Sequence, residues 1–129
     1  MDLADFETAV LAAIGAVPKK FRDKMENVAF VIEDRPRLPH RQEERIIRGG
    51  VLLGLYQGVP YGHRGPWYSG VMPDKITLFK SSIEMVAGPT EAGIRQQIER
   101  TVWHEIGHYF GMSEADARRW EHRRRGKKV

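Results

Sequence analysis

The segment from residue 90 to residue 111 constrains the fold most strongly, because its apolar residues recur with the spacing of a buried helix face. Apolar side chains occupy every fourth position: Ile94, Ile98, Val102, Ile106 and Phe110. Thr90 suits the N-cap of such a helix, and Gly111 can end it in the left-handed conformation. The pattern therefore predicts a helix of about 20 residues with one face in the core.

The last turns of this helix read His-Glu-Ile-Gly-His, from His104 to His108. Residues four apart lie on one helix face, so both imidazoles can bind a single metal ion. Glu105 lies beside them, where a carboxylate can take a proton from a metal-activated water. We predict His104 and His108 as ligands and Glu105 as general base; the alternative is an amphipathic helix with two surface histidines. Gly107 costs about 1 kcal/mol relative to Ala, which predicts a close packing contact opposite the ligands.

A third protein ligand is expected, because catalytic zinc sites normally use three together with a water molecule. Gly111 allows a sharp turn, and Glu114 follows three residues later, so its carboxylate can fold back to the metal. We predict Glu114 as the third ligand, with Asp116, Ser113 or a water as alternatives. The same residues also fit the start of another helix, with Ser113 as the cap and acids in the first turn.

The run His-Glu-x-x-His-x-x-Gly, followed by an acidic or hydroxyl residue, resembles the small zincin-like metallopeptidase family of bacterial proteins. Residues 27–36, 53–60 and 73–79 resemble that family's other blocks, in the same order. The matching blocks cover most of residues 20–116. The resemblance implies a protease-like fold and a metal site. In the family the position of Ser113 is commonly acidic, whereas here the acid, Glu114, follows it.

The remaining segments predict a small α/β (α+β) domain. The apolar stripe of the first helix is formed by Leu3, Phe6, Val10 and Ile14. Helices are expected at residues 3–15, in a short turn from Pro18 and in a charged segment near 41–47. Strands are expected at residues 28–32, 51–57 and 75–80, and residues 69–72 are a candidate edge strand. We predict a mixed sheet of three or four strands packed on the first helix and the motif helix, followed by a short C-terminal helix.

Basic residues are concentrated at the C-terminus. The chain has a net charge of +4, but residues 117–129 alone carry +6, because seven basic side chains accompany a single acid, Glu121. We therefore divide the chain into a metallopeptidase domain, residues 1–117, and a basic tail, residues 118–129. Aromatic residues that could stack on bases do not alternate with this charge, so nucleic acid is not the expected partner.

Composition favours one domain that remains in the cytoplasm. A chain of 129 residues with 41% apolar content can bury a core but is short for two domains. Its N-terminus lacks the pattern of a secretion signal, no stretch is apolar enough to span a membrane, and cysteine is absent. We therefore expect neither disulfides nor a membrane partner.

These features together predict a zinc-dependent metallopeptidase that acts on a peptide or protein substrate. Three alternatives remain open at this point. One is a metal-dependent hydrolase acting on RNA, and another is a metal-stabilised protein-interaction module without catalysis. The third is a peptidase that needs a partner for activity. The oligomeric state is not predicted.

Overall fold

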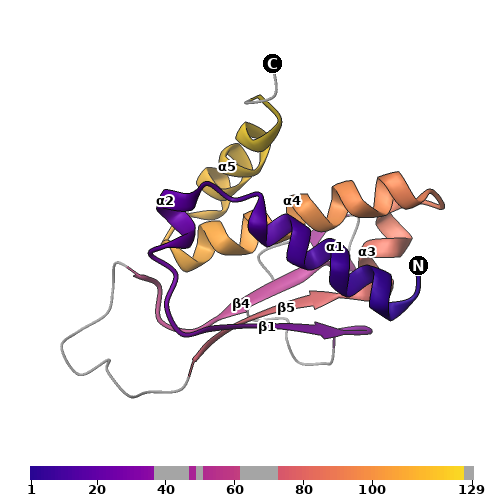
Figure 1. Cartoon of the computed structure of the whole chain (residues 1–129), viewed down its shortest axis with the longest axis horizontal. Helices are drawn as coiled ribbons and strands as arrows, with labels where there is room; N and C mark the ends of the chain where they lie inside the picture. Colours follow the sequence, from indigo (N-terminus) through magenta and orange to yellow (C-terminus); the bar gives the residue numbers. More distant parts are fainter. Residues whose placement is uncertain (37–46, 49–50, 62–72, 127–129) are drawn as a thin grey trace.

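The computed structural model describes residues 1–36, 47–48, 51–61 and 73–126 of the chain. Helices and a small mixed sheet form a single packed unit in this part of the chain, which confirms the predicted α+β class (Figure 1). The elements are α1 (Leu3–Gly15), α2 (Lys19–Arg22), β1 (Val28–Glu33), β2 (Ile47–Arg48), β3 (Val51–Leu52), β4 (Gly54–Gln57), β5 (Asp74–Phe79), α3 (Lys80–Ala87), α4 (Glu91–Tyr109) and α5 (Glu114–Gly126).

The main sheet has the strand order β1-β5-β4. β1 runs parallel to β5, with Val28 opposite Asp74, and β4 runs antiparallel to β5, with Leu55 opposite Thr77. β5 is therefore the central strand, and β4 forms one edge of the sheet within the described residues. β2 and β3 form a separate antiparallel pair.

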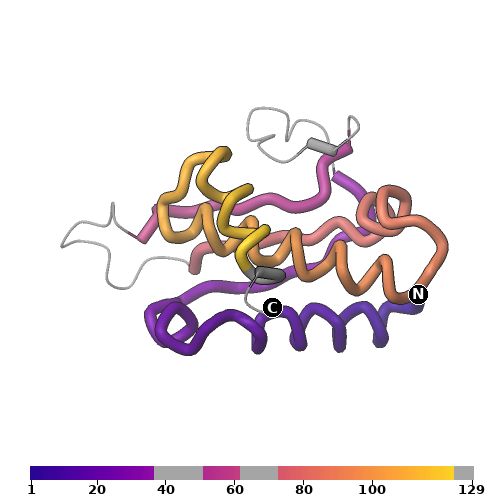
Figure 2. Tube along the Cα trace, turned by 90° about the horizontal axis from the view of Figure 1, so that it is seen from above, coloured from indigo at the N-terminus to yellow at the C-terminus, as the bar shows by residue number. Residues whose placement is uncertain are grey.

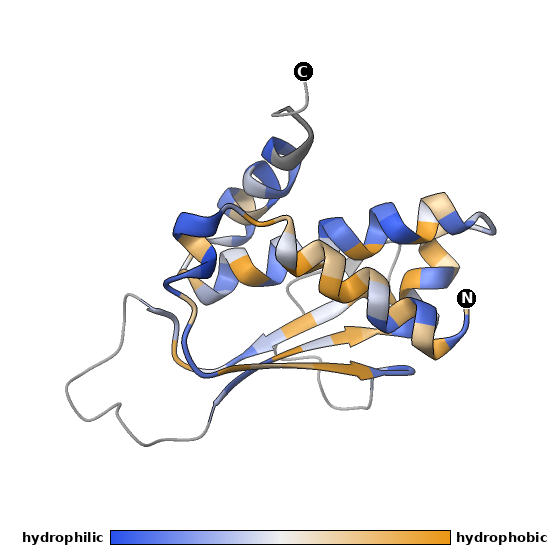
Figure 3. Ribbon diagram, in the orientation of Figure 1, coloured by the Kyte–Doolittle hydropathy of each residue, from blue (hydrophilic) through white to orange (hydrophobic). Residues whose placement is uncertain are grey.

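The core lies between the sheet and helices α1 and α4, which cover one sheet face (Figure 1). Ile76 and Leu78 of β5 point into this core, whereas Phe79 packs with Leu52 and Leu55 in a second cluster. Side chains of this strand therefore alternate between the two faces of the sheet, as the period of two of a β-strand requires. β1 is mainly apolar, whereas the described part of α5 is mainly hydrophilic (Figure 3).

α1 and α4 each begin at a side-chain cap, of which Thr90 was predicted and Asp2 was not. Asp2 accepts a hydrogen bond from the Asp5 amide at 2.8 Å at the start of α1, and Thr90 caps α4 through the Gly93 amide at 3.0 Å. Gly111 has φ 87°, so the predicted left-handed stop after α4 is confirmed. The assignment of Leu3 to the buried stripe is wrong, because 53% of its surface is exposed.

Some of the other predicted helices and strands differ from those in the structure, and some fall largely or wholly outside the described residues. The single strand predicted over residues 51–57 is split into β3 and β4, and α3 was not predicted. The charged helix near residues 41–47 lies outside the described residues except at Ile47, which belongs to β2, and the candidate edge strand at 69–72 lies wholly outside them. Within the described part of the chain, no helix combines the length and apolarity needed to cross a membrane.

The predicted C-terminal helix is present as α5, which packs against the end of α4 (Figures 1 and 2). Trp120 is 8% exposed and donates a hydrogen bond from Nε1 to the carbonyl of Trp103 at 2.7 Å. Trp120 and Ala117 also lie against Gly107, where an added Cβ would come within 3.2 and 3.3 Å of their atoms. The predicted close packing at Gly107 is therefore confirmed, but its partners lie on α5, which also carries Glu114, rather than opposite the ligands. The boundary that we placed after residue 117 falls within this packed helix.

Candidate metal centre

Three side chains that could bind one metal ion meet where α4 ends and α5 begins. Nε2 of His104 lies 3.2 Å from one carboxylate oxygen of Glu114, and Nε2 of His108 lies 3.1 Å from the other. All three residues offer ligand atoms within 4.8 Å of one another. Because α4 holds the two histidines one turn apart and Gly111 reverses the chain, Glu114 in the first turn of α5 faces both rings.

The other nitrogen of each imidazole is already used. Nδ1 of His104 is 2.7 Å from Oε1 of Glu121, and Nδ1 of His108 is 3.0 Å from the carbonyl oxygen of Met112. For His104 only the Nδ1 contact is a hydrogen bond, so Nδ1 carries the hydrogen and Nε2 presents its lone pair towards Glu114. For His108 both contacts are to acceptors, the Met112 carbonyl and Glu114, and only a hydrogen on Nδ1 leaves Nε2 available to a metal. Ligating histidines in metalloproteins are typically held in this way, through the nitrogen that does not bind the metal.

The geometry of this cluster fits a zinc ion. With bonds of 2.0–2.1 Å, ligand atoms of a tetrahedral zinc site lie roughly 3.3 Å apart, close to the two distances measured to Glu114. His104 is fully buried, and its Nε2 has no hydrogen-bond partner among the described residues. Burial, and secondly the nearby His104, lower the pKa of His108, which favours the neutral ring that a metal requires. A cation bound between the two rings and Glu114 would therefore be held by two imidazole nitrogens and a carboxylate.

Glu105 lies next to this cluster but not within it. Its side chain is 1% exposed, and its Oε2 has no hydrogen-bond partner in the part of the chain that the structure describes. Burial raises the pKa of Glu105 well above its ordinary value, and the charge of Glu114 raises it further, while a hydrogen bond from the backbone of Tyr56 opposes the shift. A carboxyl group with a raised pKa is suited to exchanging protons near neutral pH.

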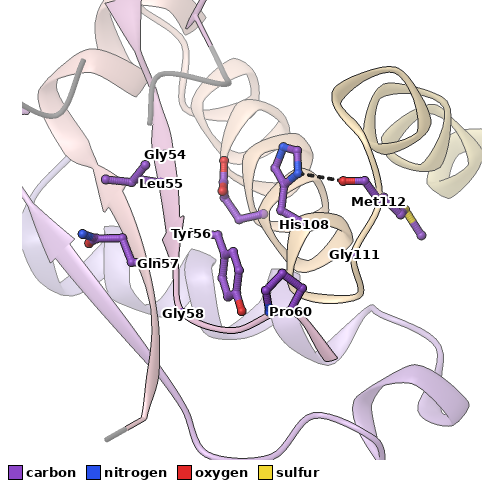
Figure 4. A pocket seen from close by; sticks show the side chains of 10 residues that line it. Gly54, Leu55, Tyr56, Gln57, Gly58, Pro60, His108, Gly111 and Met112 are labelled. Atoms are coloured by element: carbon purple, nitrogen blue, oxygen red, sulfur yellow. Dashed lines mark hydrogen bonds between the residues drawn. The ribbon is translucent and has the colours of Figure 1, made fainter. Parts of the chain in front are cut away.

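A cleft of about 390 Å³ opens between β4 and the end of α4. Glu105 and His108 line it from the helix, and residues 54–58 line it from the strand (Figure 4). Gly54 allows the close approach of the two elements, because a Cβ there would lie 2.8 Å from Cγ2 of Thr101 and 3.2 Å from Cγ of Glu105. The absence of a side chain at residue 54 therefore keeps space for the Glu105 carboxylate.

The alternatives to Glu114 have other roles. The hydroxyl of Ser113 accepts a hydrogen bond from the Asp116 amide at 3.1 Å, so Ser113 caps α5. Asp116 is exposed and forms an ion pair with Arg119. Asp116 does not belong to the group of potential His, Cys, Asp and Glu ligands found within the described residues, whereas Glu114 does.

Substitution of Glu114 and of Asp116 should therefore affect zinc binding to different extents. We expect Glu114→Ala to raise the zinc dissociation constant by about 100-fold or more, because one protein ligand in three is lost. We expect Asp116→Ala to change it by less than about threefold, because the side chain is exposed. Titration of each metal-free variant with zinc in competition with a chromophoric chelator measures both constants. The reverse order would contradict the assignment of Glu114.

Glu121 and Arg100 were missed by the sequence analysis. Glu121 is fully buried; it contacts His104 through one oxygen and accepts a hydrogen bond from Nε of Arg100 at 2.9 Å through the other. The surrounding run of basic residues led us to treat this acid as part of a solvated tail. A signal was present, since Glu121 follows Glu114 by seven residues, or two helical turns, and so shares its face of α5.

Comparison with known proteins agrees with this site. Residues 25–123 match the family model described as zincin-like metallopeptidase, and the chain therefore belongs to the zincin-like metallopeptidase family. The matched range contains the three-stranded sheet β1-β5-β4, the histidine pair and Glu114. Membership supports a hydrolase of the metallopeptidase class and, with it, zinc as the metal. A comparison with curated proteins found no match.

Proposed function

We propose that this protein is a zinc-dependent metallopeptidase in which His104, His108 and Glu114 hold the metal and Glu105 is the general base. The observation that supports this most directly is the convergence of the three ligand atoms beside a cleft that Glu105 also lines. A structural metal site would be closed on all sides by protein, whereas a catalytic one needs access for water and substrate. Here His108 and Glu105 reach the cleft.

The roles of the side chains follow from their positions. When bound, the zinc ion supplies a Lewis acid that polarises a substrate carbonyl and makes a water molecule more acidic. Glu105 accepts a proton from the attacking water and later passes it to the amine of the leaving peptide. Its burial makes this carboxylate a stronger base than an exposed glutamate, and the backbone of Tyr56 in β4 donates a hydrogen bond to it.

We propose an extended peptide as the substrate, lying along β4. The strand pairs with β5 on one side, and no other described strand pairs with its outer edge. Residues 54–58 of this segment form one wall of the cleft opposite His108 (Figure 4). An edge strand can add a peptide through main-chain hydrogen bonds, which accept many sequences. Such binding would place a peptide bond near Glu105.

The proposal predicts peptide cleavage that depends on zinc. We expect the zinc-loaded protein to cleave members of a mixture of unstructured peptides, to stop when a chelator removes the metal, and to recover when zinc is restored. Mass spectrometry of the products identifies each cleaved bond. Intact peptides after prolonged incubation with protein that holds one zinc per chain would contradict catalysis by the isolated chain.

A further inference from the structure

We infer that Glu121 is a positioning residue for the metal centre: it fixes His104 in the tautomer and orientation that leave Nε2 available to a metal. The inference rests on the proposed function, because it takes His104 as a ligand. It concerns a residue of α5 that lies seven positions beyond the third ligand and does not reach the metal itself.

Glu121 and Glu114 could each accept the single N–H hydrogen of a neutral His104 ring. Two carboxylates flank the imidazole of His104, with Glu121 2.7 Å from Nδ1 and Glu114 3.2 Å from Nε2. A neutral imidazole carries one N–H hydrogen, so only one of these carboxylates can accept it. If Glu114 accepted it, Nε2 would be blocked for metal binding. Glu121 makes the shorter contact, and only this contact has the geometry of a hydrogen bond.

The burial of Glu121 is difficult to explain by packing alone. Its side chain and that of His104 are both 0% exposed. Removing a carboxylate from water is unfavourable unless each oxygen finds a donor, and an apolar side chain often stabilises such a position equally well. The neighbouring buried residues of α5, Ala117 and Trp120, are apolar. The acid at position 121 is explained instead by its two donors, His104 and Arg100.

Arg100 lies one turn before His104 on α4 and holds the second oxygen of Glu121. Its Nε donates to Oε2 of Glu121 at 2.9 Å, and its side chain is 27% exposed, so it connects the buried acid to the surface. With Oε2 held by Arg100, Oε1 is directed at Nδ1 of His104. Each oxygen therefore has a donor in the described part of the chain, and the carboxylate cannot turn away without losing at least one of these contacts.

Two substitutions at position 121 separate this role from packing. Glu121→Gln preserves the volume but leaves one acceptor oxygen for two donors, whereas Glu121→Asp shortens the side chain but preserves both oxygens and the charge. We expect zinc affinity to fall in the order wild type, Glu121→Asp, Glu121→Gln, with a loss of about 10–100-fold in the last. Asp116→Asn is the matched control, since it removes the same charge from an exposed position of α5, and we expect less than a threefold change.

The tautomer can be measured without metal. Long-range proton–nitrogen NMR of the histidine rings in the metal-free protein should show the hydrogen of His104 on Nδ1 in wild type and in Glu121→Asp. In Glu121→Gln it should move wholly or partly to Nε2. An unchanged tautomer in Glu121→Gln, or Glu121→Asp binding zinc more weakly than Glu121→Gln, would overturn the inference. Failure of the wild type to bind zinc would overturn the proposed function instead, and the NMR result would still decide the tautomer.

Discussion

Glu105→Gln is expected to retain zinc and to lose peptide hydrolysis by about 100- to 10,000-fold, which is the usual contribution of a positioned general base. The amide has the size of the protonated acid but cannot accept a proton from water. Since burial raises the Glu105 pKa, the surrounding protein disfavours the charged carboxylate, and a neutral amide of the same size should be tolerated. Folding should therefore be little affected, and the loss should appear in kcat.

The measurement compares kcat and zinc content of the same preparations. Glu91→Gln makes the same chemical change at an exposed position in the first turn of α4, and we expect its activity to match wild type. A Glu105→Gln protein that hydrolyses peptides within about threefold of the wild-type rate would show that another group takes the proton. Loss of zinc from this variant would place Glu105 among the ligands.

The second large effect is expected from His104→Ala, which should remove zinc and also weaken the fold. Structural zinc sites bind with about 10–16 kcal/mol spread over four ligands, so loss of one ligand should weaken binding by about 100- to 1,000-fold. His104 is also the donor to buried Glu121. Its removal takes one hydrogen-bond donor from a buried carboxylate, which costs about 1–3 kcal/mol.

His108→Ala is the matched comparison for this variant. His108 is 13% exposed, and its Nδ1 bonds a backbone carbonyl rather than a buried acid. We expect a comparable loss of zinc affinity but a smaller fall in the melting temperature of the metal-free protein. Equal destabilisation of the two metal-free variants would contradict the account of the buried contact between His104 and Glu121.

The parts of the structure that the sequence predicted depend on contacts within one element. Thr90 and Gly111 mark the ends of α4 through local backbone chemistry, and the alternation in β5 separates Ile76 from Phe79. The histidine pair follows from helical spacing alone. These features require no knowledge of what packs against them.

The parts that were missed depend on how distant elements meet. Glu121 is a buried partner of His104 only because α5 folds back on α4, and its sequence neighbours suggest an exposed charged helix. Leu3 satisfies the apolar period of α1, but 53% of its surface is exposed. The close approach at Gly54 likewise depends on the packing of β4 against Thr101 of α4, which is 47 residues later. Tertiary contacts of this kind cannot be predicted from periodicity.

The most direct test of the central claim is the metal content of the purified protein, measured by mass spectrometry beside His104→Ala and Glu114→Ala. We predict about one zinc per wild-type chain, its loss from the first variant, and a strongly reduced content in the second. A wild-type protein that binds no zinc, even after dialysis against the metal, would contradict the metal centre. The histidine pair and Glu114 would then be a partly buried polar cluster of the fold.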